Sequence, residues 1–497
     1  MTQRAQFWTA FTLLACAVLF RALPFVWWPS LHFDSDQATV GLMARHISEG
    51  RAFPLYYYGQ TYMLAVEAYA AAPFMWALGA TVTALKLPLL IVNVAVVFVL
   101  LRLLVRDAAL SPWVASIAVL PLALPAAPIA ARTTEAMGGN VEPWLYVLLL
   151  WMVRGRPFAF GTVLGIGMLH REFTAYAAAA LIIVDALGLL SAPVRRVYFS
   201  DRAKHWALAA VAWVAVRAAA GILQPFGSAW GPGTHGDDLW MPPVDDVGRY
   251  LCFAPETWAE RSRLLVSDHL PRLFGGVGAP LFDYGVHTGV YSGQPGLGAW
   301  VGLITVAGFA GGTSFWWSQR RLTNAPPIPH IGGYLVLVGV ISTLVYGYLS
   351  CSAIRVETLR YNLLGMFVPV GALVMGLQAW RNTTARAALA AAVVLWCAVN
   401  ALDMVALIRE YRSHPLVDYR QVLADDLVAR GVTSARAPFR AAYHVTFLAG
   451  ERVRIAATDF TRIRAYTEEA ARSGAPTISD TSCRQGTPLN NGQYLCP

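Results

Sequence analysis

The sequence predicts an all-α polytopic membrane protein with a small α/β domain at its carboxyl end. Three observations support this prediction. The chain of 497 residues is 57% hydrophobic and only 13% charged, whereas soluble proteins are roughly one quarter charged. Many of its apolar runs approach the length of about 20 residues that a helix needs to cross a bilayer. After residue 408 these runs stop, and shorter amphipathic patterns with more charged residues follow.

The apolar runs divide residues 1–408 into about eleven predicted transmembrane helices. Arg21 interrupts the first run, which also lacks a small-residue cleavage site, so we interpret it as a retained span and not a signal peptide. Trp27 and Trp28 suit the membrane interface at its end. The predicted spans are residues 7–28, 84–105, 113–131, 141–153, 157–170, 173–190, 205–223, 297–317, 331–350, 362–380 and 386–408.

The positions of arginine and lysine predict the orientation of these spans. If segment 61–80 lies along the membrane surface, cationic pairs such as Arg102 with Arg106 all fall on one side, which is then cytoplasmic. The amino terminus is predicted to lie on that side too. Because membrane orientation accounts for these cations, the net charge of +9 does not indicate a nucleic-acid partner. The predicted outer regions are residues 29–83, 132–142, 170–172, 224–296, 351–362 and 409–497.

Residues 409–497 are predicted to form a periplasmic α/β domain of about 90 residues, long enough to fold. The segments YRQVLADDLVARG and TRIRAYTEEAARSG have helical spacing, whereas AYHVTFL and ERVRIAA alternate as strands do. Cys483 and Cys496 lie in a polar tail without a core, and an oxidising periplasm favours a disulfide between them. Cys252 and Cys351 also face outward and could pair or remain single.

The first outer loop begins with FDSDQATVGLMARHISEG (33–50), the densest polar cluster near the amino terminus. Apolar residues recur at helical spacing after Asp36, which predicts a short amphipathic helix in the membrane interface. Asp34 and Asp36 would face one way in an extended segment. One acid could act as a general base, or the pair could hold Mg²⁺ or Mn²⁺. Alternatively, Asp36 only caps the helix and Asp34 is solvated.

Arginines on the predicted outer face could bind a phosphate, because the guanidinium fork matches its oxygens. Arg217 lies inside a predicted span. A charged residue there either has a function or extends its side chain to the membrane–water interface. Glu67 lies in an apolar segment and would need a partner if buried. His170-Arg171-Glu172 could be a polar hairpin, and Tyr56-Tyr57-Tyr58 an interfacial belt. The candidate cations are Arg45, Arg132, Arg171, Arg217, Arg355 and Arg360.

The segment DSDQATVGLMARHISEGRAFPLYYYGQTYMLAVEAY resembles the first outer loop of GT-C-type glycosyltransferases that use polyprenyl-phosphate sugars. The closest group is family 39, the bacterial aminoarabinose, galacturonic-acid and mannosyl transferases. Asp36-Gln37-Ala38 and Ala44-Arg45 match that family's Asp-Glu-Ala and Ala-Arg frame. The resemblance implies Asp36 as the base, with Asp34 as a helper or alternative. Gln37 departs from the usual Glu, so the role of the second acid could shift to Asp34.

Other segments resemble family motifs less specifically. GGNVE (138–142) resembles the second outer loop, and LRYNLL (359–364) resembles a motif near the donor phosphate, although its usual proline is delayed to Pro369. ALKLP (84–88) resembles the entry to the second span, and YHVTFLAGERVRIA the outer domain of a bacterial subgroup. The donor-binding candidates are Arg360, Tyr361, Arg217 and Arg45. The substrate-binding candidates are Tyr58, Gln60, Glu67, Glu142, His170, Arg171 and Glu172.

The resemblance implies inverting transfer of a sugar from a polyprenyl phosphate to a hydroxyl of a glycolipid, polysaccharide or protein. The expected location is the periplasmic face of a bacterial inner membrane. A flippase or transporter of lipid-linked glycans is an alternative, but such proteins place charges at the bilayer midplane, and here most polar residues lie on one predicted face. Another alternative is a polymerase or ligase that acts in the same compartment but uses glycans linked to a lipid diphosphate as donors.

Overall fold

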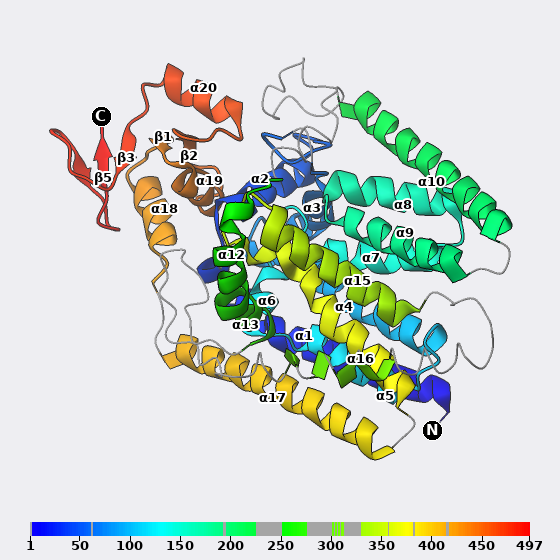
Figure 1. Cartoon of the computed structure of the whole chain (residues 1–497). Helices are drawn as coiled ribbons and strands as arrows, with labels where there is room; N and C mark the ends of the chain where they lie inside the picture. The colour runs from blue at the N-terminus through cyan, green and yellow to red at the C-terminus, as the bar shows by residue number, and fades with distance from the viewer. Residues whose placement is uncertain are drawn as a thin grey trace.

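The computed structural model describes residues 2–60, 63–191, 195–224, 251–275, 301–312 without 303, 306 and 309, 330–355, 357–380, 383–413 and 417–497. Its larger part is a bundle of helices, and a small sheet with its own helices lies at one end of the bundle (Figure 1). The prediction of a polytopic helical protein with a carboxyl-terminal α/β domain is confirmed in these residues.

Six helical segments of the described chain are long and apolar enough to cross a membrane. They are α1 (Gln3–Trp27), α4 (Val82–Arg106), α10 (Arg195–Leu223), α15 with η6 (Ile331–Leu344, Val345–Leu349), η7 with α16 (Glu357–Met366, Phe367–Ala379) and α17 (Thr383–Ser413). Shorter apolar helices fill other predicted spans: α5 (Pro112–Ala123), α7 (Glu142–Val153), α8 (Pro157–His170) and α9 (Thr174–Ser191). Most of the predicted span 297–317 lies outside the described residues.

The predicted span 113–131 is two helices and not one. Helix α5 ends at Ala123, and the short α6 (Ala127–Arg132) begins after a break. Pro125 lies in this break; proline has no N–H to donate and disfavours helical geometry in the residue before it. The break lets the chain turn toward the polar segment that follows Arg132.

Residues 29–83, predicted to form the first outer loop and called the first outer segment below, contain η1 (Pro29–His32), α2 (Ser35–Ser48) and α3 (Val66–Leu78). Helix α2 starts where the polar cluster predicts a helix, and Gly50, with φ of +68°, follows its end. Helix α3 has 13 residues, fewer than the roughly 20 that a span requires. Its length does not distinguish it from α5, α7 and α8, which have 12 to 14 residues, so the placement of this segment along the membrane surface stays a prediction.

The carboxyl-terminal domain follows α17, and its first helix, α18, begins at Tyr419. A five-stranded sheet has the order β2-β1-β3-β5-β4, with β1 parallel to both β2 and β3 and β5 antiparallel to β3 and β4. A disulfide joins Cys483 to Cys496, with an Sγ–Sγ distance of 1.95 Å. The elements are α18 (Tyr419–Ala429), β1 (Ser434–Ala437), α19 (Phe439–Leu448), β2 (Arg454–Ala457), α20 (Arg464–Arg472), β3 (Thr477–Ser479), β4 (Thr487–Pro488) and β5 (Tyr494–Cys496).

The helices predicted for this domain and the strand in ERVRIAA are present, but the strand predicted for AYHVTFL is wrong, because this segment belongs to α19. Alternation of Tyr443, Val445 and Phe447 suggested a strand. All residues from Ala441 to Phe447 are buried, because α19 packs against α2 as well as against β2 and α18. A helix buried on most sides shows no clear polar face, so its period is hidden in the sequence.

Helix α19 connects the domain to the helical bundle through α2. The ring of Phe33, just before α2, lies 5.3 Å from the ring of Phe447 and 5.0 Å from that of His444, centroid to centroid. A Cβ atom on Gly41 would lie 2.6 Å from Cε2 of Phe447. Glycine at position 41 therefore permits the close approach of the two helices, which fixes the domain beside the first outer segment.

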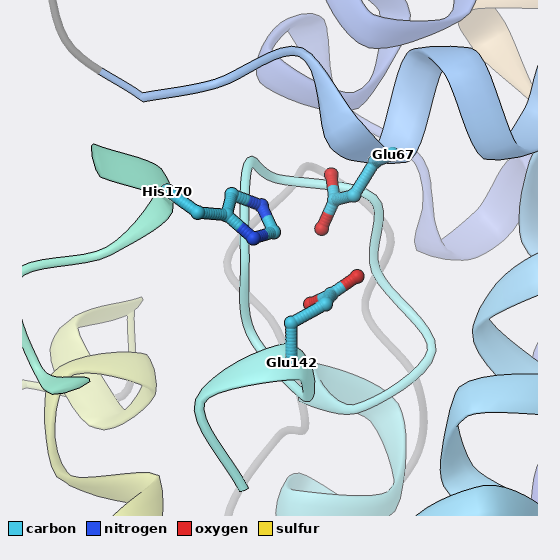
Figure 2. A group of neighbouring side chains, drawn as sticks. All are labelled: Glu67, Glu142 and His170. Atoms are coloured by element: carbon cyan, nitrogen blue, oxygen red, sulfur yellow. The ribbon is translucent and has the colours of Figure 1, made fainter. Parts of the chain in front are cut away.

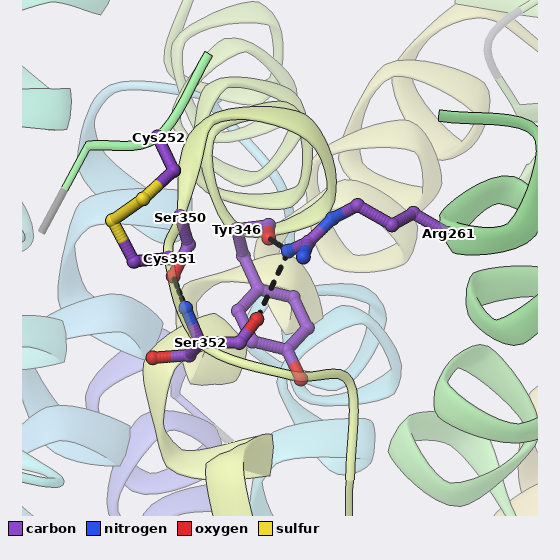
Figure 3. The surroundings of a disulfide bond; sticks show 6 residues. All are labelled: Cys252, Arg261, Tyr346, Ser350, Cys351 and Ser352. Carbon is purple, nitrogen blue, oxygen red and sulfur yellow. Dashed lines mark hydrogen bonds between the residues drawn. A yellow bond between two sulfur atoms is a disulfide. The ribbon is translucent and has the colours of Figure 1, made fainter. Parts of the chain in front are cut away.

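Part of the long loop 224–296, which is predicted to face outward, is also described. Residues 255–274 are helical, as η4 (Pro255–Thr257), α12 (Trp258–Leu264), η5 (Leu265–His269) and α13 (Leu270–Phe274). A disulfide joins Cys252 to Cys351, and the Arg261 guanidinium donates to the backbone carbonyls of Tyr346 and Ser352, at 3.0 and 3.1 Å (Figure 3). These bonds hold the loop against the segment that leads into η7.

Candidate functional site

Buried polar contacts hold the turn between α1 and α2 in place. The Lys86 ammonium, near the start of α4, donates to the carbonyls of Phe25, Pro29 and His32, at 3.2, 3.2 and 2.8 Å. The same His32 carbonyl accepts from the Gln37 side chain at 3.1 Å. The chain therefore enters α2 along a fixed path, which sets the direction of the two acids there.

The two acids at the start of α2 have different roles. Asp34 is the N-cap, because its side-chain oxygen accepts from the backbone N–H of Gln37 at 2.9 Å. Asp36 lies in the first turn, and 27% of its side chain is exposed. The interpretation that Asp36 caps the helix while Asp34 is solvated is therefore wrong: the capping residue is Asp34.

The Asp36 carboxylate lies between two arginines from distant parts of the chain. Nη1 of Arg360, in η7, is 3.6 Å from Oδ2 of Asp36, and Nη2 of Arg462, in the carboxyl-terminal domain, is 4.0 Å from Oδ1. The Tyr57 hydroxyl donates to the Asp36 backbone carbonyl at 2.8 Å. The arrangement is an acid accessible to solvent with positive charge on both sides. Arg360 is one of the residues predicted from the sequence, whereas Arg462 is not.

The surroundings of Asp34 increase its affinity for a proton. Burial, together with the negative charges of Asp36 and Glu135, raises the pKa of Asp34 to about 6, although the hydrogen bond from Gln37 and the charge of Arg360 lower it. At neutral pH such a carboxyl remains largely ionised but binds a proton more readily than an ordinary aspartate. Asp34 can therefore assist proton transfer near Asp36 while it caps the helix.

Arg360 is positioned by its neighbours on both sides. Its Nη1 lies 3.3 Å from the Met137 sulfur, and Nη2 lies 3.3 Å from the Tyr361 hydroxyl, whose ring is 5.2 Å from the guanidinium carbon. The Tyr361 ring also has an edge contact with Phe173, at 6.1 Å. The predicted donor-binding pair Arg360-Tyr361 thus lies beside Asp36.

A second polar group lies deeper, where Glu67, Glu142 and His170 point toward one another (Figure 2). One potential ligand atom from each lies within 4.8 Å of the others, and all three residues are buried. The Glu67 carboxylate accepts from the backbone N–H groups of Gly138 and Gly139, at 2.6 and 2.7 Å. Both glycines have positive φ, +78° and +104°, a conformation that residues with a Cβ rarely adopt.

Two carboxylates and an imidazole are suitable ligands for a divalent cation. This group therefore offers better metal ligands than the pair Asp34 and Asp36. The sequence predicts these three residues only as substrate-binding candidates. Burial raises the pKa of Glu67 to about 7. A shared proton or a bound cation would therefore reduce the repulsion between Glu67 and Glu142. The Tyr146 hydroxyl orients the imidazole through Nδ1 of His170, at 3.1 Å.

Arg171 connects this acidic group to the surroundings of Asp36. Its Nε donates to the Gly139 carbonyl at 3.3 Å, and its Nη1 lies 3.3 Å from the Met63 sulfur. The loop 137–139 therefore contacts Arg171, Glu67 and, through the Met137 side chain, Arg360. The structure thus brings together predicted residues from four separate segments of the sequence.

Other predicted site residues lie elsewhere or have structural partners. Arg45 is near the opposite end of α2 from Asp36, where it pairs with Glu49 at 2.8 Å and with Glu451 at 3.3 Å. The buried Tyr58 hydroxyl contacts Nδ1 of His46 at 2.9 Å. Both belong to the contact between α2 and the carboxyl-terminal domain.

The remaining candidates differ in their surroundings. The Arg217 guanidinium lies 5.9 Å from the Trp213 ring on α10, and its charge reaches Tyr56 in the first outer segment. Glu172 is half-buried beside Tyr176. The Gln60 amide oxygen, in the orientation that satisfies its neighbours, accepts from Arg462 at 2.8 Å. Arg132 pairs with Glu135 at 2.9 Å in a buried contact.

The helices and the site describe a polytopic membrane protein with a charged site where its first outer segment meets η7 and the carboxyl-terminal domain. No protein-family model matches the chain, and no curated protein matches it. Among solved structures, the chain is similar to the apo crystal structure of ArnT from Cupriavidus metallidurans. The TM-score is 0.43 at 13% sequence identity, and the match covers 96% of this chain and 97% of that chain.

Proposed function

We propose that the protein is an inverting glycosyltransferase that moves a sugar from a polyprenyl-phosphate donor to a hydroxyl acceptor. The proposal is supported above all by the half-exposed Asp36 carboxylate between Arg360 and Arg462. A carboxylate can accept the proton of an attacking hydroxyl. Guanidinium groups can bind the phosphate that departs. The proposed acceptor is a glycolipid, polysaccharide or protein, and the other proposed partners are the membrane lipids around the helical bundle.

The reaction would be a single displacement. The acceptor oxygen attacks the anomeric carbon while its proton passes to Asp36. The bond from that carbon to the phosphate oxygen breaks, and its electron pair stays on the phosphate. Arg360 is placed to stabilise the charge that develops there, which is where a fixed cation accelerates a reaction. Because attack and departure occur on opposite faces, the configuration at the anomeric carbon inverts.

A divalent cation at Asp34 and Asp36 stays a prediction. Asp34 already accepts a hydrogen bond from the α2 backbone, and two guanidinium groups lie within 4.0 Å of Asp36. These neighbours repel a cation and supply positive charge themselves. The proposed chemistry therefore needs no metal at these two acids.

The donor class can be tested with purified protein in lipid nanodiscs. We expect sugar transfer and release of polyprenyl phosphate from a polyprenyl-monophosphate sugar, measured by mass spectrometry of the lipid products. A polyprenyl-diphosphate sugar of the same chain length is the matched control and should not react. Reaction with the diphosphate alone would indicate a polymerase or ligase. Movement of intact lipid across vesicle membranes without bond cleavage would indicate a flippase.

The proposed orientation places the amino terminus in the cytoplasm and the carboxyl-terminal domain in the periplasm of a bacterial inner membrane. It rests on the placement of arginines and on a non-spanning α3. We expect alkaline phosphatase fused after Pro497 to be active in cells, and green fluorescent protein at the same position to be dark. The opposite pair of results would show that segment 61–80 crosses the bilayer.

A further inference from the structure

We propose that a pocket between α8, α9 and α10 binds the phosphate group of a membrane phospholipid, on the side of the membrane that is predicted to be cytoplasmic. This pocket is separate from the site around Asp36. Helix α7 begins at Glu142, in the acidic group, and Arg154 of the pocket follows its last residue. The 12 residues of α7 place the two about 18 Å apart. The inference therefore does not depend on the proposed sugar transfer.

The pocket lies beside the turn that joins α7 to α8, and its volume is about 190 Å³. The predicted spans on either side of this turn have their other ends in outer regions, so the turn is predicted to lie at the cytoplasmic surface. Pockets that enclose a whole small ligand are larger, roughly 300–1,000 Å³, so this one suits a headgroup. Its lining combines apolar side chains with charged ones: Phe160, Leu181 and Val184 with Arg154, Asp185 and Arg202.

Contacts between the three helices fix the shape of the pocket. Helices α8 and α10 pack closely where a Cβ on Gly161 would clash with the Ala209 backbone carbonyl. The Phe160 ring has an edge contact with the Trp206 ring at 5.2 Å. The Trp206 indole N–H donates to Oδ2 of Asp185 at 2.9 Å, which joins α10 to α9. A headgroup would therefore enter a preformed pocket, and little freedom of the protein is lost when it binds.

The two arginines of the pocket retain hydrogen-bond donors for a ligand. Nη1 of Arg154 donates to the Trp151 carbonyl at 2.7 Å and lies 3.5 Å from Oδ2 of Asp107. Nη1 of Arg202 lies 3.5 Å from Oδ1 of Asp185. Within the described residues, the contacts of both guanidinium groups with oxygen atoms thus involve Nη1, and N–H groups on Nε and Nη2 remain for a ligand. Both side chains are about one third exposed.

The charge of the lining favours an anion. Two guanidinium groups accompany one carboxylate, that of Asp185, among the described lining residues. The two oxygens of this carboxylate already contact Trp206 and Arg202. A phosphate has several acceptor oxygens, and guanidinium groups bind them through strong, charge-assisted hydrogen bonds. Basic pockets between transmembrane helices on the cytoplasmic side bind lipid headgroups through the same chemistry.

The surroundings of the pocket indicate a lipid as the source of this phosphate. The same three helices carry exposed apolar side chains, such as Phe158 on α8, Ile182 on α9 and Leu208 on α10. Helices that cross a bilayer present such side chains to the acyl chains of lipids. A phospholipid can place its phosphate against the arginines and its acyl chains along these helices. Free phosphate would use only the charged part of the pocket.

Native mass spectrometry of the full-length protein in detergent micelles tests this site. Wild type would be titrated with phosphatidylglycerol, and with diacylglycerol of the same chains as a control without phosphate, at one ionic strength. The variants are Arg154→Gln and Arg202→Gln. Arg156→Gln is the matched control, because Arg156 lies on the same turn but is exposed and outside the pocket lining. We expect each of the first two variants to bind phosphatidylglycerol about 5-fold more weakly. Diacylglycerol binding, and phosphatidylglycerol binding by Arg156→Gln, should stay as in wild type.

Wild-type affinity for phosphatidylglycerol in both of the first two variants would overturn the proposal. An equal loss in Arg156→Gln would overturn it too, because it would indicate a general attraction between a basic surface and an anionic lipid. An equal loss of diacylglycerol binding would show that the phosphate is not what the pocket recognises. Displacement of the lipid by millimolar inorganic phosphate would assign the pocket to a soluble phosphate compound.

Arg202→Lys keeps the test decisive if a glutamine variant unfolds. Lysine retains the positive charge but not the planar fork of the guanidinium. We therefore expect Arg202→Lys to fold and to bind phosphatidylglycerol more weakly than wild type, with a smaller loss than in Arg202→Gln. Thermal unfolding in the absence of added lipid would confirm that each variant is folded, and wild-type affinity in a folded Arg202→Lys would contradict a role for the guanidinium fork.

Discussion

Replacing Asp36 with asparagine should lower the rate of sugar transfer at least 100-fold, the usual range for loss of a general base, while the protein still folds and inserts. Asparagine has nearly the same shape, and the Asp36 side chain is half-exposed, with 3.6 Å to Arg360 as its shortest ion-pair distance within the described residues. Packing should therefore change little. What disappears is the ability to accept the acceptor's proton. Transfer rates and thermal unfolding of the purified variant would be measured together.

Asp34→Asn is the matched control for this variant. Asparagine caps helices about as well as aspartate, so α2 should persist, and we expect a smaller loss of rate because Asp34 is proposed only to assist. Wild-type turnover in Asp36→Asn would refute the assignment of Asp36 as the base. Loss of turnover in Asp34→Asn alone would move that role to Asp34, whose raised pKa already favours proton binding.

The sequence predicts most of the fold because hydropathy decides it. Apolar runs must become helices in a bilayer, where every backbone polar group needs an internal partner. The two errors have local causes. Pro125 breaks a run that is apolar throughout. In α19, residues on several sides of the helix are buried and apolar, so the sequence shows an alternation of large residues and no helical period.

The candidate site was only partly predictable, because it combines near and distant residues. Asp34 and Asp36 follow from a local pattern, but Arg462 approaches Asp36 from the other end of the chain. No periodicity or spacing encodes such a contact. Arg45 illustrates the reverse problem. It follows Asp36 by nine residues on one helix, which places it about 13 Å further along the axis, so closeness in sequence did not mean a shared site.

The second large effect is expected at Glu451, which joins the carboxyl-terminal domain to α2. Its carboxylate contacts Nε2 of His46 at 3.0 Å, the Tyr466 hydroxyl at 2.7 Å and the Arg51 guanidinium. Only 4% of its side chain is exposed. Glu451→Gln should destabilise the docked domain by about 2 kcal/mol, since the buried amide cannot accept all the hydrogen bonds that the carboxylate receives from His46, Tyr466 and Arg51. Chemical unfolding and limited proteolysis between α17 and α18 would measure this.

This contact also predicts a dependence on pH. Burial alone would raise the pKa of Glu451, but the hydrogen bonds from His46 and Arg51 outweigh it and hold that pKa well below its ordinary value of 4.5. A lowered pKa means that the stabilisation is complete above about pH 4.5 and is lost as the pH falls below it. Wild-type stability should therefore decline in acid more steeply than that of Glu451→Gln. Glu49→Gln is the control: Glu49 pairs with the same Arg51 but is 39% exposed, so its effect should stay below about 1 kcal/mol. Parallel acid profiles for wild type and Glu451→Gln would show that the ion pair does not hold the domain in place.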